Sequence, residues 1–139
     1  MPQMIGGATQ VVVPLHFGKA NVADADGTLT AVDGSSLEYV MPVPGSIIGI
    51  TGRSNAAFTT GTMTFQATID GSLCPAFPDA ACLRTNQQTG RYSQPQGKAN
   101  FVFAAGARIG VMWDKAGTID PTTNDVSVLL FVTQDSLRY

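Results

Sequence analysis

Residues 45–71, G-S-I-I-G-I-T-G-R-S-N-A-A-F-T-T-G-T-M-T-F-Q-A-T-I-D-G, decide the fold class of this chain. In the second half of the segment, apolar side chains at Met63, Phe65, Ala67 and Ile69 alternate with threonine or glutamine. Such period-two alternation is typical of a β-strand with one buried face. The segment therefore predicts a strand that packs on a core through its apolar face.

The first half of the same segment predicts a second strand, with Ile48, Ile50 and Gly52 on one face. The residues between the halves are rich in asparagine, alanine, threonine and glycine, which favours a connecting loop. No catalytic or ligand motif lies in the segment, so we expect it to be a scaffold.

Other short strand-like runs, separated by glycine and proline turns, flank this segment. We expect strands near 9–17, 28–32, 37–41, 73–74, 81–85, 98–105, 106–114 and 125–133, a loop over 114–124, and no helix. Many short strands with such turns favour a sandwich or a barrel. The prediction is an all-β fold: a jelly-roll-like antiparallel β-sandwich of about eight short strands with an extended N-terminal arm.

The run V-V-V-P-L-H-F near the N-terminus is β-prone but contains Pro14. Proline removes a ladder donor, so the run predicts an edge strand or an arm that lies on a partner. We therefore divide the chain into an N-terminal arm or edge strand, 1–17, and a single sandwich domain, 18–139. His16 is expected to be a surface or interface residue.

The last predicted strand, 125–133, is apolar on both faces. Valine and leucine alternate from Val126 to Val132 on one face, and Leu129 and Phe131 lie on the other. A strand that is apolar on both faces is covered on both, so we expect a second surface to cover Leu129 and Phe131.

The segment 72–97 is long and contains three prolines and a polar tract. Long loops in compact domains are often functional, and we expect residues 84–98 to protrude. Arg91 and Tyr92 are residue types that anchor interfaces. They are either such an anchor or part of a solvated loop tip.

The composition limits the function classes. The chain of 139 residues has a net charge of −2, and only 13% of its residues are charged. The basic residues are scattered, so the sequence does not favour nucleic-acid binding. It has no long apolar run, so it does not favour a membrane-spanning helix. The N-terminus lacks the pattern of a cleaved signal peptide, so we expect synthesis in a cytoplasm. Low charge favours oligomerisation or docking over a solvated surface.

Candidate chemistry is sparse. Cys74 and Cys82 are either free thiols, as a reducing compartment favours, or a late disulfide that closes a small loop. One histidine, His16, and one glutamate, Glu38, give no recognisable catalytic arrangement, and no phosphate-binding glycine motif occurs. We expect no enzyme activity, no cofactor and no metal site.

The order of several motifs resembles small β-sandwich proteins of tailed bacteriophages, the capsid decoration (cement) and head-fibre group. The resemblance covers residues 42–71 and 101–133. It is carried by G-S-I-I-G-I, T-T-G-T-M-T-F-Q-A-T-I-D-G, A-G-A-R-I-G-V and T-N-D-V-S-V-L-L-F-V. These are strand and turn patterns, and the insert between Cys74 and Lys98 has no counterpart among them.

The resemblance implies a virion structural protein, a trimer or other small oligomer, on the capsid exterior. It would bind the major capsid protein at capsomer junctions, with no nucleic-acid or membrane partner. The expected capsid or protomer contacts lie in the N-terminal arm: Met4, Ile5, Val12, Pro14, Leu15 and Phe17. The alternatives are a phage fibre or tail module that binds a host receptor or glycan through Arg91 and Tyr92, and a non-viral carbohydrate-binding sandwich.

Overall fold

The computed structural model describes residues 10–22, 27–31, 38–75, 82–83, 89–98, 100–120 and 124–135. These residues form strands and connecting turns, with no helix among them. The strands are β1 (Gln10–Val22), β2 (Gly27–Thr28), β3 (Thr30–Ala31), β4 (Tyr39–Val40), β5 (Gly45–Ser54), β6 (Thr60–Ile69), β7 (Ser72–Leu73), β8 (Cys82–Leu83), β9 (Thr89–Ser93), β10 (Val102–Phe103), β11 (Arg108–Asp120) and β12 (Asn124–Asp135). The all-β prediction is confirmed, although three of the strands, β1, β11 and β12, are longer than expected.

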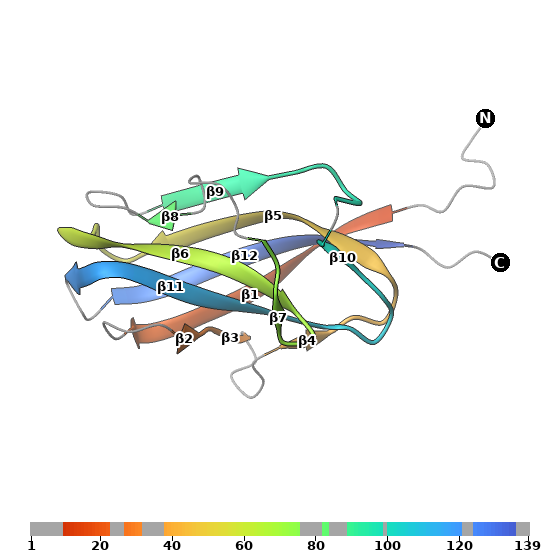
Figure 1. Ribbon diagram of the computed structural model, residues 1–139, viewed down its shortest axis with the longest axis horizontal. Coiled ribbons are helices and arrows are strands. Elements are labelled where there is room, and N and C mark those ends of the chain that lie inside the picture. Colours follow the sequence, from red (N-terminus) through yellow and green to blue (C-terminus); the bar gives the residue numbers. More distant parts are fainter. Residues whose placement is uncertain are drawn as a thin grey trace.

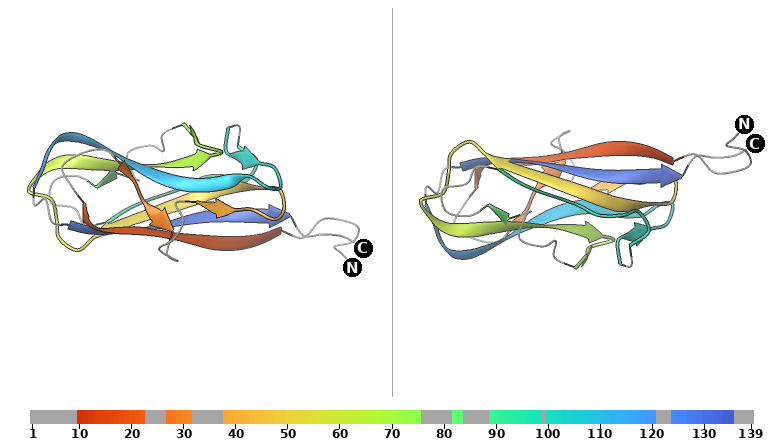
Figure 2. Two further views of the ribbon diagram at one scale, coloured as in Figure 1. Left: turned by 90° about the horizontal axis from the view of Figure 1, so that it is seen from below. Right: turned by 90° about the horizontal axis from the view of Figure 1, so that it is seen from above.

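The strands form two antiparallel sheets that lie face to face as two layers (Figures 1 and 2). Sheet A has the order β10-β5-β12-β1-β3, and β9 also pairs with β5. Sheet B has the order β2-β11-β6-β7, with β4 on β11 and β8 on β6. The chain passes from sheet A to sheet B between β5 and β6, and returns to sheet A between β11 and β12.

The strand order is that of a jelly roll. Sheet A contains the row β1-β12-β5-β9, and sheet B contains the row β2-β11-β6-β8. Counted along the chain, these eight strands run 1-8-3-6 in one sheet and 2-7-4-5 in the other. That arrangement is the double Greek key of a jelly-roll sandwich, as the sequence predicted.

The core fills the space between the sheets, where alternate residues of each long strand point inward. On β12, Val126, Val128, Leu130 and Val132 are buried. On β6, Met63, Phe65 and Ala67 are buried, as the alternation predicted. Sheet B adds Ile109, Val111, Trp113 and Ile119 from β11.

Strand β5 departs from the predicted alternation because it contains a β-bulge. Phe131 of β12 pairs with Gly49, and the next residue, Val132, pairs with Ile47, so Ile48 is an extra residue. Ile47 and Ile50 are therefore the buried isoleucines, whereas Ile48 is only half-buried. The prediction that Ile48 shares a face with Ile50 was wrong, since a bulge shifts the register by one residue.

Gln94 holds this bulge from outside the strand. Its backbone N–H donates to the Ile48 carbonyl (2.8 Å), and its Nε2 donates to the Ile47 carbonyl (2.8 Å). The carbonyls that the bulge removes from the regular ladder are thus satisfied, which a buried backbone requires.

Strand β11 continues through residues 114–120, where a loop was predicted. Gly117 has φ +73°, and the register with β6 shifts between Ala116 and Asp120, where pairing resumes with Thr60. Ile119 beyond the shift is fully buried. The glycine permits an irregularity in the left-handed region, so one strand spans a segment whose composition resembles a loop.

Strand β1 belongs to the sandwich from its first described residue. Gln10–Lys19 pair with β12, and β3 pairs with β1 only at Phe17 and Gly18. The side of β1 away from β12 is therefore open over Gln10–His16 among the described residues. On that side the His16 carbonyl accepts a hydrogen bond from the Tyr39 hydroxyl (3.0 Å).

Pro14 fits this open edge. The backbone groups of residues two apart in a strand point the same way, so the nitrogen of Pro14 faces the same side as the His16 carbonyl. Pro14 therefore removes no hydrogen bond to β12. It also withholds a donor from any strand that could add to the edge, which is a common protection of edge strands.

The closest approach of the two sheets predicts a test of the core. Gly52 of β5 faces Phe65 of β6, and a Cβ at position 52 would lie 2.5 Å from the ring. We expect Gly52→Ala to lower the free energy of unfolding by about 1–3 kcal/mol, because the ring must shift in a packed core. Urea unfolding measures the change. Phe65→Leu should recover part of it in the double variant, and additive losses would contradict this packing.

Candidate interaction surface

The outer face of sheet A is the face of β1, β12, β5 and β9 that points away from sheet B. Its side chains form three rungs across the four strands, fixed by the pairing registers. From β1 to β9 the rungs are Gly18–Ser127–Arg53–Thr89, His16–Leu129–Thr51–Arg91 and Pro14–Phe131–Gly49–Ser93. Apolar groups thus gather near β1 and β12, and cationic groups gather on β5 and β9.

The apolar part of this face surrounds a hollow. Leu129 and Phe131 are half-buried, and Val12 is 55% exposed. Gly49 has no side chain opposite Phe131, and a hollow of about 590 Å³ lies there, lined also by Val12, Ile48 and Tyr92. No described element covers Leu129 and Phe131, so the expected covering surface is not part of the described chain.

The cationic part of the face contains Arg53 and Arg91. A second hollow of about 580 Å³ is lined by both arginines together with Thr51, Thr89 and Leu129. Thr51 stands opposite Arg91, and Arg53 is two residues further along β5. The arginines are therefore diagonal cross-strand neighbours, a relation that places two residues of a sheet about 7–8 Å apart. Both are exposed, and neither side chain has a hydrogen bond or ion pair with another described residue.

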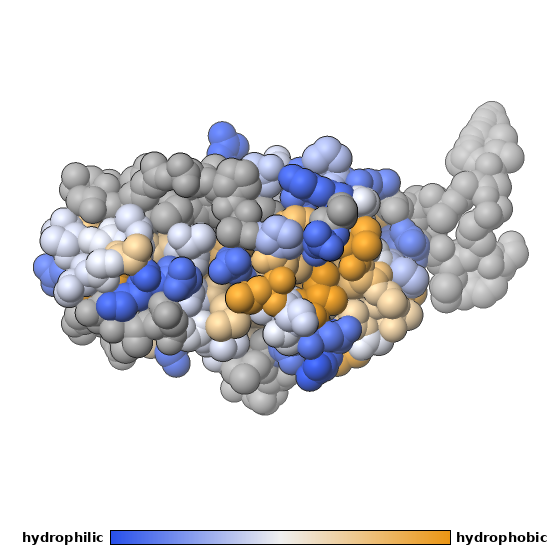
Figure 3. Space-filling model, viewed as in Figure 1, coloured by the Kyte–Doolittle hydropathy of each residue, from blue (hydrophilic) through white to orange (hydrophobic). Residues whose placement is uncertain are grey.

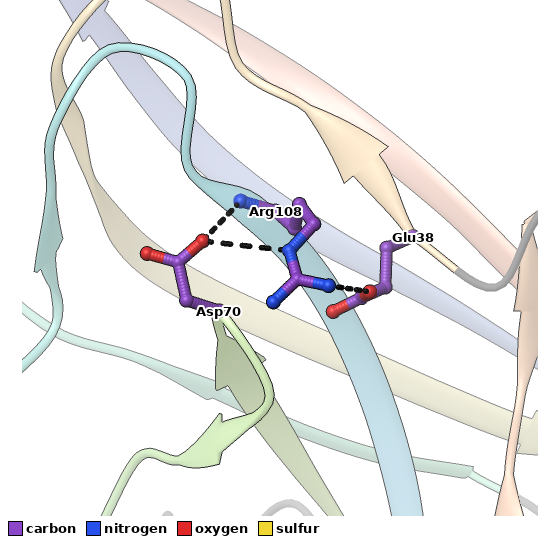
Figure 4. Close-up of polar contacts among 3 residues, drawn as sticks. All are labelled: Glu38, Asp70 and Arg108. Carbon is purple, nitrogen blue, oxygen red and sulfur yellow. Dashed lines mark hydrogen bonds and ion pairs between the residues drawn. The ribbon is translucent and has the colours of Figure 1, made fainter.

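Arg108 shows the contrasting case of an arginine used within the fold (Figure 4). Its Nη1 lies 3.6 Å from Glu38 Oε1, and its Nε lies 3.7 Å from Asp70 Oδ1. The same Asp70 oxygen accepts the backbone N–H of Arg108 at 3.0 Å. Asp70 and Gly71, with φ of 52° and 83°, form the turn between β6 and β7. Arg108 therefore joins this turn to β4 and is not free for a partner.

A separate apolar area lies between β7 of sheet B and β10 of sheet A. Leu73 of β7 and Val102 of β10 are 54% and 52% exposed, and they line a hollow of about 540 Å³ with Ile69. Figure 3 shows an apolar area where β7 and β10 lie in Figure 1. The molecule thus presents apolar side chains on two sides of the sandwich.

The structure divides the predicted contact residues of the N-terminal arm. Met4 and Ile5 lie outside the described residues. Val12 and Pro14 are exposed on β1. Leu15 and Phe17 were wrong as contact residues, because they point into the core with exposures of 6% and 1%.

Phe17 is further fixed by Tyr39, whose ring meets it edge-on at 5.3 Å between centroids. The prediction failed because Pro14 favoured an edge strand or an arm on a partner, and the inward-facing side of an edge strand was not considered. The strand alternation of the run was the signal that could have identified both core residues.

Arg91 and Tyr92 lie in β9, paired with β5, and not at a loop tip. Arg91 is exposed, and Tyr92 is half-buried against the core. Sequence reasoning missed Arg53 as a neighbour of Arg91, because the two are 38 positions apart and only the β5–β9 register brings them together. Of the rest of the predicted protrusion, residues 84–88 lie outside the described residues, Gln94 is buried against β5, and residues 95–98 are exposed.

The cysteine alternatives are narrowed by the pairing of β6. Cys74 is a free, buried thiol whose backbone N–H bonds to the Ala67 carbonyl (3.0 Å). Cys82 pairs with Thr64 on the same side of β6. Ala67 and Thr64, the β6 neighbours of Cys74 and Cys82, are three positions apart. Three positions along a strand span about 10 Å, which exceeds the reach of a disulfide. Burial raises the pKa of the Cys74 thiol to about 11, so it is a neutral, unreactive group.

The described residues provide neither a metal-binding cluster nor a membrane-spanning helix. No group of three or more histidine, cysteine, aspartate or glutamate side chains that could hold a metal ion occurs among them. Asp120, an exposed acid at the end of β11, accepts a hydrogen bond from the Thr59 hydroxyl (2.9 Å). The described part of the chain has no helix long and apolar enough to cross a membrane.

Comparisons with known proteins give weak structural similarities. No protein-family model matches the sequence, and no curated protein matches it significantly. A chain of the cyanophage Pam1 capsid asymmetric unit is similar with a TM-score of 0.48 and 16% identity, over 99% of this chain and 91% of that one. A chain of desmodium yellow mottle tymovirus is similar with a TM-score of 0.39 and 10% identity, over 100% of this chain and 95% of that one. A chain of the empty head of turnip yellow mosaic virus is similar with a TM-score of 0.37 and 13% identity, over 100% of this chain and 88% of that one. Similarities at these scores assign neither family nor function.

The burial of Cys74 predicts its reactivity. In a Cys82→Ser background, we expect Cys74 to resist a thiol reagent near neutral pH while the protein is folded, and to react fully once it is unfolded. A spectrophotometric thiol assay measures both rates. Rapid reaction in the folded protein would contradict the buried position.

The same group predicts a pH dependence of stability. The folded pKa of about 11 lies above the ordinary value of 9.0, so the folded state holds the thiol proton more tightly. This contribution to stability is complete below pH 9.0 and is lost as the pH rises towards about 11. The free energy of unfolding should therefore fall more steeply over this range than in Cys74→Ala, which shares all other alkaline titrations. Equal slopes would contradict the prediction.

Proposed function

We propose that this protein is a structural component of a bacteriophage virion, which decorates the outside of the capsid and stabilises it by binding the major capsid protein at capsomer junctions. The single observation that carries the proposal is the uncovered apolar part of the outer face of sheet A. Leu129 and Phe131 lie on the central strand of that sheet, yet no described element packs on them. Apolar groups in such a position are typical of an interaction site.

The sequence resemblance supports the same proposal. Its two stretches, 42–71 and 101–133, supply strands β5, β6, β11 and most of β12, which form the centre of both sheets. The jelly-roll order is one that viral capsid domains and lectin domains both use. Because a fold alone does not define a function, the surface and not the fold decides between these classes.

The proposed mechanism is stabilisation by binding. A protein that binds only the assembled shell stabilises that shell by mass action. Repetition of a modest interface over a symmetric shell strengthens the effect, since each oligomer engages several sites together. A decoration oligomer, for which we favour a trimer, needs contacts to the shell and to its own copies. Apolar areas on two sides of the sandwich could serve these two contacts.

A shell-binding experiment tests the function. We expect the purified protein to bind mature capsids that lack it and to raise their melting temperature, measured by calorimetry. Leu129→Ser/Phe131→Ser should lose this effect while its own melting changes little, because neither side chain enters the core. Val40→Ser, which removes an apolar group that is 65% exposed elsewhere, is the matched control.

Two outcomes would contradict the proposal. Wild-type protein that leaves shell melting unchanged and binds host cells would support the receptor-binding alternative, in which Arg91, Tyr92 and their hollows are the binding site. Undiminished decoration by the Leu129→Ser/Phe131→Ser variant would exclude the apolar part of the outer face as the contact.

The N-terminal residues provide a separate test. Met4 and Ile5 precede β1, whose exposed residues Val12 and Pro14 adjoin the outer face. An arm that becomes ordered on binding can cover much surface with few residues. We expect deletion of residues 1–8 to abolish shell binding without lowering the melting temperature of the domain. Normal decoration by the truncated protein would rule out a role for the arm.

A further inference from the structure

The two arginines of the outer face are arranged at a cost to the isolated protein. Arg53 and Arg91 are diagonal neighbours on β5 and β9, with threonine side chains between them. Like charges placed next to each other on a sheet repel. The fold provides an acidic partner for Arg108 but none, among the described residues, for this pair. Stability within the domain therefore does not explain why both positions are cationic.

The charges around the pair leave its centre positive. β12 carries two acidic residues, Asp125 and Asp135. Asp125 lies two residues beyond Ser127, the partner of Arg53, and is therefore a diagonal neighbour of Arg53, whereas Asp135 lies at the opposite end of the strand. One acidic group next to two arginines leaves the local charge positive. The titratable group within the rungs is His16, which lies across the sheet from Arg91 beyond Leu129 and Thr51.

The surroundings of the pair indicate what it binds. The chain as a whole has a net charge of −2, and two arginines are too few for a polyanion such as nucleic acid, which needs an extended basic surface. The cationic hollow adjoins the apolar one, because Thr51 and Arg91 line both. Arginine beside apolar side chains is a usual composition of a protein–protein interface centre.

We propose that Arg53 and Arg91 bind carboxylate groups of a protein partner, whose neighbouring apolar side chain enters the hollow over Gly49. The partner is a segment of the capsid shell that presents aspartate or glutamate next to an apolar residue, so this inference rests on the proposed function. Each guanidinium would donate hydrogen bonds to a carboxylate, a pairing stronger than one between neutral groups. Thr51, Thr89 and Ser127 supply further hydroxyl donors in the same hollow.

The decisive experiment compares charge variants on purified shells that lack the protein. Arg53→Glu/Arg91→Glu should bind at least about 30-fold more weakly than wild type, since it removes two interface arginines and adds repulsion. Arg53→Lys/Arg91→Lys should retain part of the affinity. Lys19→Glu/Lys98→Glu makes the same change in net charge at exposed positions outside the rungs, and should bind like wild type. Circular dichroism melting of each variant establishes that it is folded.

Chemical neutralisation of the shell tests the partner's chemistry directly. Amidation of exposed carboxylates on the shells with a carbodiimide and glycinamide should reduce wild-type binding to the level of Arg53→Glu/Arg91→Glu. It should leave that variant's residual binding little changed.

The possible results separate the two proposals. Absence of wild-type binding to untreated shells would overturn the proposed function. Two results would leave the proposed function standing and overturn the arginine–carboxylate inference. One is an equal loss of binding in Arg53→Glu/Arg91→Glu and in Lys19→Glu/Lys98→Glu; the other is wild-type binding that survives amidation of the shell.

Discussion

The position of β12 between β1 and β5 is the constraint on which the rest of the structure depends. Gln10 pairs with Asp135, so the beginning of the described chain and its end lie side by side in sheet A. The inner side chains of β12 form the centre of one wall of the core. Without this strand, β1 would lose its main pairing and β5 would keep only β9 and β10.

This arrangement makes the fold strongly non-local. Sheet A needs both ends of the chain, whereas β11 and β6, the centre of sheet B, come from the middle and later parts. Loop closure has to precede such pairings, so formation of sheet A is expected to be the late and slow part of folding. The interior then permits little variation, because the sheets approach so closely at Gly52 and Phe65 that one methyl group would have no room.

The sequence predicted the features that depend on local alternation and failed where distant residues intervene. β6 and β12 were predictable because their apolar faces repeat every two residues. The bulge at Ile48 was not, since Gln94 holds it from another part of the chain. The extension of β11 depends on Gly117, which also fits a loop. Leu15 was misassigned because Pro14 suggests an edge, and an edge strand still has one face in the core.

The interaction surface was harder to predict for the same reason. Arg91 was singled out by residue type, but its pairing with Arg53 exists only through the register of β5 and β9. The uncovered side chains of Leu129 and Phe131 were visible in the sequence as an apolar outer face. The sequence did not show which element would cover these two side chains, because the packing of one element on another depends on the whole fold.

The outer face of sheet A carries apolar and cationic side chains that packing of the core does not require. Val128 and Leu130 on β12 have to be apolar because they face the core, whereas polar residues at 129 and 131 would leave the core intact. Apolar groups left in water forgo the free energy of burial, and two adjacent unpaired arginines repel. The exposed apolar side chains and the two arginines lie on neighbouring strands, around two hollows that are both lined by Thr51 and Arg91. A single protein partner that is apolar in one part and acidic in the next would offset both, which is why we assign them to one interface.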